Sequence, residues 1–139
     1  MLSMNINHPD IEEFITKKQD LTKVTGANIS VKVTDEFMKA VEEDKNYFLR
    51  YPVSYDVSEL NPENYELGVL TEIKDPNYKR VYVKKVNAKT LWGVLMHCAF
   101  STAEPGIMFE SRMHNYSPDG VYPDFKMVST NPSEYYQAA

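Results

Sequence analysis

The sequence has little cysteine, no excess of positive charge and no long apolar run. Cys98 is the single cysteine among 139 residues, which excludes a disulfide framework or a thiolate zinc site within one chain. The 15 Lys and Arg residues against 20 Asp and Glu give a net charge of -5, unlike a basic nucleic-acid-binding surface. No run approaches the roughly 20 apolar residues that span a bilayer, and the N-terminus lacks a signal-peptide pattern. We therefore expect a cytoplasmic protein with no nucleic-acid and no membrane partner.

The remaining composition is that of one globular domain, with 42% hydrophobic and 25% charged residues. Strands and helices are predicted to alternate along most of the chain, which indicates an α/β layer with parallel strand pairing. An irregular surface excursion is expected over 54–78, where prolines interrupt the pattern. The expected strands are 1–6, 28–33, 47–53, 80–86, 107–113 and 125–130, and the expected helices are 7–19, 34–45 and 87–100.

The clearest periodicity belongs to the helix expected over 87–100. Its apolar residues recur with the i, i+3, i+4, i+7 spacing of a buried helix face. We expect Trp92, on this face, to be largely buried against the strands at 29–33 and 107–109. The residues of the face are Ala88, Leu91, Trp92, Leu95, Met96 and Ala99.

Residues with catalytic or metal-binding chemistry are scattered. His97 and Cys98 are adjacent in a predicted helix and point about 100° apart, so with His114 they favour core or surface roles. No metal site is predicted. The segment 19–28, "QDLTKVTGAN", is long for a helix-to-strand connection and rich in hydrogen-bond donors. Such loops often bind ligands, and the residues alone leave open whether this one does.

Four segments, taken together, resemble consecutive parts of the catalytic subunit of ribonucleotide reductase. The resemblance is strongest to the adenosylcobalamin-dependent class and covers residues 1–132, leaving 133–139 as a non-matching tail. Those enzymes are several times longer, so we expect the chain to be an internal segment of one. The segments are "NINHPDIEEFITKKQDLTKVTGANISVKV", "DEFMKAVEEDKNYFLRYPV", "LWGVLMHCAFSTAEPGIMFESRMHNYSPDGVY" and "FKMVSTNP".

The resemblance implies a fold, a reaction and a cofactor. The fold is α/β, about half of a ten-stranded α/β barrel of the ribonucleotide reductase type. The reaction reduces ribonucleotides to deoxyribonucleotides for DNA synthesis. In the complete enzymes a cysteine thiyl radical, generated with adenosylcobalamin, abstracts the 3' hydrogen, and a redox cysteine pair supplies electrons.

The resemblance also assigns candidate site residues. The loop after the first helix resembles the effector-specificity loop, here Gln19, Asp20, Leu21, Thr22, Lys23, Val24, Thr25 and Gly26. The motif Asn-Pro-Cys-Gly-Glu of the family matches this chain at Asn131 and Pro132 only. Asn131 corresponds to a substrate contact, Ser133 stands in the position of the radical cysteine, and Glu134 is a displaced candidate for the general base.

These departures lead to the expectation that the isolated chain is inactive and binds no cofactor of its own. Whether it is an enzyme is thus left uncertain. One alternative is a non-catalytic module, derived from the same fold, that binds nucleotides or docks on a reductase; another is an unrelated α/β domain with an accidental likeness. The expected partners are the remainder of the reductase, a second copy in a homodimer, and, weakly, nucleotides. From the patterns at both of its ends, we expect the chain to be cut from a longer protein.

Overall fold

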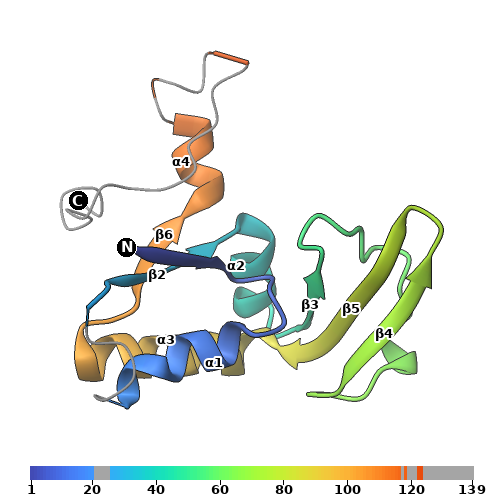
Figure 1. Cartoon of the computed structure of the whole chain (residues 1–139), viewed down its shortest axis with the longest axis horizontal. Coiled ribbons are helices and arrows are strands. Elements are labelled where there is room, and N and C mark those ends of the chain that lie inside the picture. Colours follow the sequence, from blue (N-terminus) through green and yellow to red (C-terminus); the bar gives the residue numbers. More distant parts are fainter. Residues whose placement is uncertain (21–25, 117, 119–121, 124–139) are drawn as a thin grey trace.

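The computed structural model describes residues 1–20, 26–116, 118, 122 and 123, which form two three-stranded sheets beside each other (Figure 1). None of the helices in this part of the chain is both long and apolar enough to cross a membrane. In chain order, the elements are β1 (Leu2–Asn5), α1 (Ile11–Thr16), a 3-10 turn (Lys17–Gln19), β2 (Ile29–Val33), α2 (Asp35–Glu42), β3 (Asn46–Tyr51), a 3-10 turn (Pro62–Asn64), β4 (Leu70–Asp75), β5 (Tyr78–Asn87), α3 (Ala88–Thr102), β6 (Gly106–Phe109) and α4 (Glu110–Tyr116).

The first sheet is parallel, with strand order β1-β2-β6, and we call it, with α1, α2 and α3, the body. Leu2 pairs with Ile29, and Ser30 pairs with Gly106. Helices α1 and α3 lie side by side along one face of this sheet (Figure 1). The central strand β2 is buried on both faces, since Val31 and Ser30, which point in opposite directions, are each 0% exposed. The expected α/β layer with parallel pairing is therefore present in the body.

The body helices begin at side-chain caps. Thr34 Oγ1 accepts a hydrogen bond from the Phe37 N–H at 3.2 Å, which starts α2. Asn87 Oδ1 accepts one from the Thr90 N–H at 2.9 Å, so β5 passes directly into α3. Helix α3 ends at Ala103, whose φ of 59° is left-handed. Its buried face consists of Ala88, Leu91, Leu95 and Cys98.

The second sheet is antiparallel, with strand order β3-β5-β4, and we call it the arm. Tyr51 pairs with Tyr82, and Thr71 pairs with Val83. Phe48, Val81 and Val83 form a small core of their own on one face of this sheet. The half-buried side chains that pack against this core are Tyr55, Val57, Leu60, Tyr65, Ile73 and Tyr78.

One prediction about this region is wrong. Strand β5 pairs antiparallel with both β3 and β4, and β4 lies within the segment 54–78. That segment is therefore not a bare surface excursion. Its first part covers the arm core and its last part supplies the outer strand of the arm.

Two further predictions about the second half of the chain need correction. Trp92 is half-buried and not largely buried, with its ring centroid 6.5 Å from that of Phe37 in α2. The buried face of α3 is rotated toward Cys98, which leaves Trp92 at its border. The strand expected over 107–113 ends at Phe109, and helix α4 begins at Glu110. The strand expected over 125–130 lies outside the described residues.

Candidate functional site

The carboxyl ends of the parallel strands bring polar side chains together at one edge of the body. Asn5 ends β1 and Glu110 directly follows β6, and the Asn5 Nδ2 donates a hydrogen bond to a Glu110 carboxylate oxygen at 3.5 Å. His114, one turn further along α4, has its Nε2 3.8 Å from the other Glu110 oxygen. The Asp35 N–H, at the start of α2, donates to Ser111 Oγ at 3.1 Å. We call these five residues the carboxyl edge.

The carboxyl edge combines an amide, two carboxylates, a hydroxyl and an imidazole. Asn5 and Glu110 are each half-buried, so they are partly shielded and still accessible. Groups of this kind orient a polar ligand by hydrogen bonds and can move a proton through the imidazole or a carboxylate. In α/β sheets, ligands bind outside the carboxyl ends of the parallel strands. This edge is therefore the strongest candidate for a functional site among the described residues.

A second polar cluster connects the body to the arm. Asn7, just beyond β1, accepts a hydrogen bond at its side-chain oxygen from the Tyr47 hydroxyl. The Arg50 guanidinium donates to the Tyr47 oxygen at 3.2 Å and to a Glu36 carboxylate oxygen at 3.3 Å. Asn7, Tyr47 and Arg50 are all buried. Burial raises the pKa of the Tyr47 hydroxyl, and the neighbouring Arg50 charge opposes that rise.

This cluster, which we call the junction network, joins the two sheets. The Arg50 backbone N–H also donates to the Asn7 carbonyl at 2.7 Å, so strand β3 is tied to the end of β1 through both main chain and side chains. One atom of the network, Arg50 Nε, is buried without a hydrogen-bond partner among the described residues. The network adjoins the carboxyl edge, because the Asn7 backbone N–H donates a hydrogen bond to Asn5 Oδ1 at 3.2 Å.

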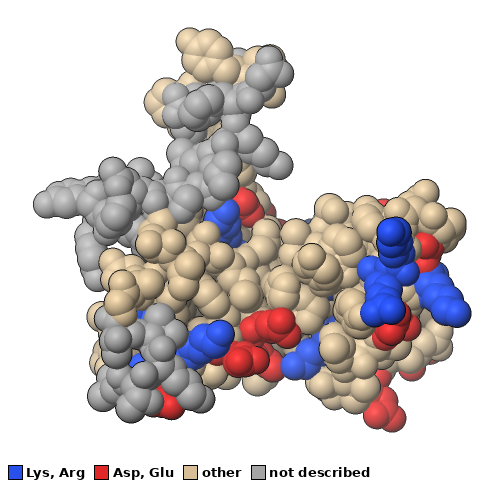
Figure 2. Space-filling view, in the orientation of Figure 1, with Lys and Arg blue, Asp and Glu red and all other residues tan. Residues whose placement is uncertain are grey.

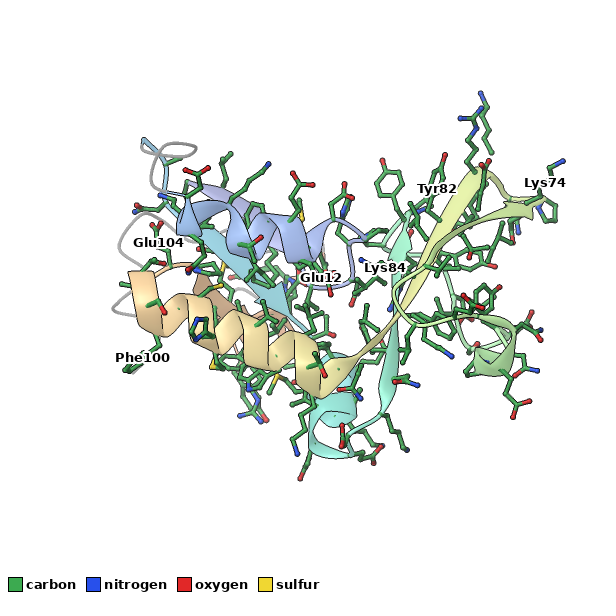
Figure 3. The ribbon with its side chains drawn as sticks, turned by 90° about the horizontal axis from the view of Figure 1, so that it is seen from below. Glu12, Lys74, Tyr82, Lys84, Phe100 and Glu104 are labelled. Atoms are coloured by element: carbon green, nitrogen blue, oxygen red, sulfur yellow. The ribbon has the colours of Figure 1, made fainter. Side chains whose placement is uncertain are left out.

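The predicted specificity loop is described only at its two ends. Gln19 and Asp20 precede it and Gly26 closes it, whereas Leu21, Thr22, Lys23, Val24 and Thr25 lie outside the described residues. Beside the start of the loop, Lys18 Nζ lies 2.7 Å from a carboxylate oxygen of Glu104, which follows α3. Figure 3 shows Glu104 at the carboxyl-terminal end of that helix. The start of the loop is therefore held against the end of α3.

Cys98 belongs to the same corner of the body. Its thiol is buried on α3, and this burial raises its pKa, while a hydrogen bond with the Gln19 side chain acts in the opposite direction. A buried thiol with a raised pKa is a poor nucleophile. His97, its neighbour in the chain, is exposed on α3, and His114 lies at the carboxyl edge. The described residues contain no cluster of three or more His, Cys, Asp or Glu suited to a metal ion.

Sequence reasoning missed the two central residues of the carboxyl edge. Both, Asn5 and Glu110, are polar residues at the carboxyl ends of predicted strands. Once parallel pairing is inferred, that position indicates that the two residues lie at one edge of the sheet. Glu110 was not recognised because its strand was expected to continue to residue 113. The residues taken from the family motif, Asn131, Ser133 and Glu134, all lie outside the described residues.

The parallel sheet with helices on its face and polar groups at its carboxyl edge defines an α/β protein. The family model described as "Ribonucleotide reductase, barrel domain" matches residues 1–138. The chain belongs to this family. The match extends past Pro132 into the last seven residues of the sequence. Within the described residues the two sheets do not close into a barrel.

Three relatives illustrate where the similarity lies. The vitamin B12-dependent ribonucleoside-diphosphate reductase of Thermoplasma acidophilum is 29% identical over 130 residues, which cover 93% of this chain and 13% of that protein. The vitamin B12-dependent ribonucleotide reductase of Streptomyces avermitilis is 26% identical over 139 aligned residues, which cover 84% of this chain and 12% of that protein. The ribonucleoside-diphosphate reductase NrdEB subunit alpha of Bacillus subtilis is 29% identical over 122 residues, which cover 84% of this chain and 11% of that protein. The chain thus spans about an eighth of these relatives.

Proposed function

We propose that this chain is a segment of the catalytic subunit of an adenosylcobalamin-dependent ribonucleotide reductase. The observation that carries the proposal is the family match along residues 1–138, together with two vitamin B12-dependent reductases among the relatives. In the complete enzyme the segment forms about half of a ten-stranded α/β barrel and works in the cytoplasm. The enzyme reduces ribonucleotides to deoxyribonucleotides.

In that enzyme, the carboxyl edge of this segment contacts the nucleotide substrate. Asn5, Glu110 and His114 offer hydrogen-bonding groups to the sugar or base of a nucleotide, and Glu110 can accept a proton from a hydroxyl group. The loop from Gln19 to Gly26 carries the effector signal, with its start fixed by the Lys18–Glu104 ion pair. Asn131 contacts the substrate ribose. The positions of Asn5, Glu110 and His114 support their proposed roles, and the resemblance to the family supports those of the loop and of Asn131.

Two cavities among the described residues do not fit adenosylcobalamin. One, of about 570 Å³, is open to solvent around the β4–β5 turn, and the other, of about 280 Å³, lies between the start of α1 and the arm. Neither encloses a group as large as a corrin ring. The first, at the far end of the arm, is lined by both basic and acidic side chains, and Figure 2 shows Lys and Arg gathered there beside acidic residues. We assign the cofactor to other parts of the complete enzyme.

The isolated chain is expected to be inactive because of the residue at position 133. A serine alkoxyl radical is much higher in energy than a cysteine thiyl radical, so Ser133 cannot exchange a hydrogen atom reversibly with the 3' carbon. Purified chain, supplied with adenosylcobalamin, a dithiol and ribonucleotides, should form no deoxynucleotide above a no-protein control. The Thermoplasma enzyme assayed in parallel is the positive control. Deoxynucleotide formation by the chain alone would contradict the proposed inactivity.

A chimera tests the proposed function itself. Residues 1–132 of this chain replace the matching segment of the Thermoplasma reductase, which keeps that enzyme's own radical cysteine. The chimera should reduce ribonucleotides, and Glu110→Gln in it should lower kcat/KM about tenfold or more, as loss of a group contacting the substrate does. Glu13→Gln, an exposed carboxylate on α1, is the matched control and should have no effect. A folded but inactive chimera would contradict the proposal.

A second candidate function is a non-catalytic module that binds nucleotides weakly or docks on a reductase. The observation in its favour is β1, an outer strand of the parallel sheet with Leu2 53% exposed. An outer strand offers backbone groups for pairing with another chain. The partner is then the remainder of the reductase or a second copy of this chain. Light scattering at tens of micromolar measures the mass of the chain in solution, and a monodisperse monomer would argue against the homodimer.

A further inference from the structure

A small cup of aromatic rings lies where the start of α1 meets the arm. Its cavity of about 280 Å³ is smaller than most pockets for drug-sized ligands and suits a single side chain. Tyr51 and Tyr82 are cross-strand partners of β3 and β5, so both rings project from the same face of the arm. Figure 3 shows Tyr82 on β5. The lining residues are His8, Pro9, Asp10, Tyr51, Leu70 and Tyr82.

The walls of the cup are held in place from the α1 side. The His8 ring stands edge-on to the Tyr51 ring, with centroids 5.3 Å apart and planes at 64°. His8 Nδ1 accepts a hydrogen bond from the Asp10 backbone N–H at 3.1 Å, which fixes the orientation of the imidazole. Pro9, which also lines the cup, is buried. On the arm side, Tyr51 is 52% and Leu70 is 53% exposed, so the cup is open to a ligand arriving from solvent.

The lining of the cup contains no Lys or Arg. Its carboxylate, Asp10, is 70% exposed and has one oxygen 3.9 Å from His8 Nδ1, whose imidazole is positive only when protonated. Lys84 is nearby on β5, but its Nζ lies 2.9 Å from a Glu12 carboxylate oxygen and its side chain is 19% exposed (Figure 3). Aromatic faces attract cations, and a carboxylate adds a direct charge partner. A phosphate or another anion would find no Lys or Arg in this lining.

We propose that this cup binds an arginine side chain carried by a partner protein. A guanidinium group is flat, stacks on tyrosine rings and forms two parallel hydrogen bonds with one carboxylate, which matches the two tyrosines and Asp10. A lysine ammonium lacks the planar stacking and the paired hydrogen bonds, so it binds more weakly. The inference concerns a surface of the arm and does not depend on reductase activity.

Nuclear magnetic resonance titration of the full chain with the blocked peptide acetyl-Gly-Arg-Gly-amide tests the proposal. The shift changes should centre on His8, Asp10, Tyr51 and Tyr82, and the lysine counterpart should bind about threefold more weakly or worse. Guanosine serves as a probe for a nucleobase instead. Tighter binding of guanosine than of the arginine peptide, or equal binding of the lysine peptide, would overturn the assignment.

Variants separate the roles of ring and charge. Tyr82→Leu and Asp10→Asn should each weaken binding of the arginine peptide about threefold or more. Tyr82→Phe keeps the aromatic face and should retain the affinity of the unchanged chain. Tyr116→Leu and Glu13→Gln, both exposed and away from the cup lining, are the matched controls. Asp10 is at the surface, so its variant remains decisive even if Tyr82→Leu disturbs the fold. Unchanged affinity in Asp10→Asn would sink the proposal.

Discussion

In the body, the central strand β2 has buried side chains on both faces, and helices add to the same core. In the arm, β4 alternates between exposed and half-buried residues, and the arm core contains three buried residues, Phe48, Val81 and Val83. Apolar burial is the main source of folding free energy. The body therefore supplies most of the stability of the described chain. The arm is a thin layer that keeps one face available for contacts, and the aromatic cup lies on that face.

Truncating a core residue of the body should have the largest effect. Leu95→Ala removes a side chain that is 0% exposed at the centre of α3, and we expect a loss of about 2–5 kcal/mol in the free energy of unfolding. Ile73→Ala, in half-buried β4 of the arm, should cost about 1 kcal/mol. Urea denaturation followed by circular dichroism measures both. Equal costs would mean that the arm contributes as much as the body.

The junction network should show an intermediate effect. Asn7→Ala removes the acceptor for the Tyr47 hydroxyl and leaves a buried polar group with a poorer set of partners, so a loss of about 1–3 kcal/mol is expected. Asn115→Ala, at an exposed position of α4, is the control and should change stability little. A loss in Asn7→Ala no greater than in the control would show that body and arm are held together by other contacts.

Alkaline pH should weaken the same joint. The folded-state pKa of Tyr47 is raised by burial, so its contribution to stability is complete below the unfolded pKa of about 10 and is lost as pH rises through the folded value. Unfolding is measured from pH 8 to 11 in a Cys98→Ala background, because burial also raises the pKa of that thiol. Adding Tyr47→Phe should flatten the decline above about pH 10. If Tyr47→Phe left the slope of unfolding free energy against pH unchanged, Tyr47 would not be the group responsible for the loss.

The smallest effect is expected at the surface of the arm. Arg80 Nε lies 3.7 Å from a Glu72 carboxylate oxygen, and both side chains are more than half exposed. Such pairs contribute about 0–1 kcal/mol, so Glu72→Gln should change the free energy of unfolding by less than about 0.5 kcal/mol. Thermal denaturation at low and high salt checks this. A large, salt-dependent loss would show that charges, and not the small core, hold the arm together.

The sequence predicted the body well because its residues follow simple periods. The helix expected over 7–19 contains α1, whose apolar residues Ile11, Phe14 and Ile15 are buried, and the strand expected over 28–33 is β2, where Ile29, Val31 and Val33 alternate along the chain. Trp92 was misjudged because apolar residues occur on more than one side of α3. The packing of α1 and α2 against α3, which the sequence does not reveal, determines which side is buried.

The arm was harder to predict for a physical reason. Strand β4 is half-exposed, so its sequence "LTEIKD" contains a single large apolar residue, Ile73, on the buried side. Pairing direction also depends on the connection between strands, and the two-residue turn at Pro76 and Asn77 was assigned to the irregular segment. The carboxyl edge depended on the parallel order β1-β2-β6, which places Asn5 beside Glu110 although 104 residues lie between them in the sequence.

The pairing pattern also sets the order of events in folding. In the arm, Asp75 pairs with Tyr78 across a two-residue turn, so the hairpin can close on the microsecond timescale typical of such local contacts. In the body, Ser30 must find Gly106, and the chain between them includes the whole arm. Contacts between residues so distant in sequence pay a larger loop-closure entropy and form slowly. The less stable region should therefore form first, and its closure shortens the effective distance over which the parallel sheet has to assemble.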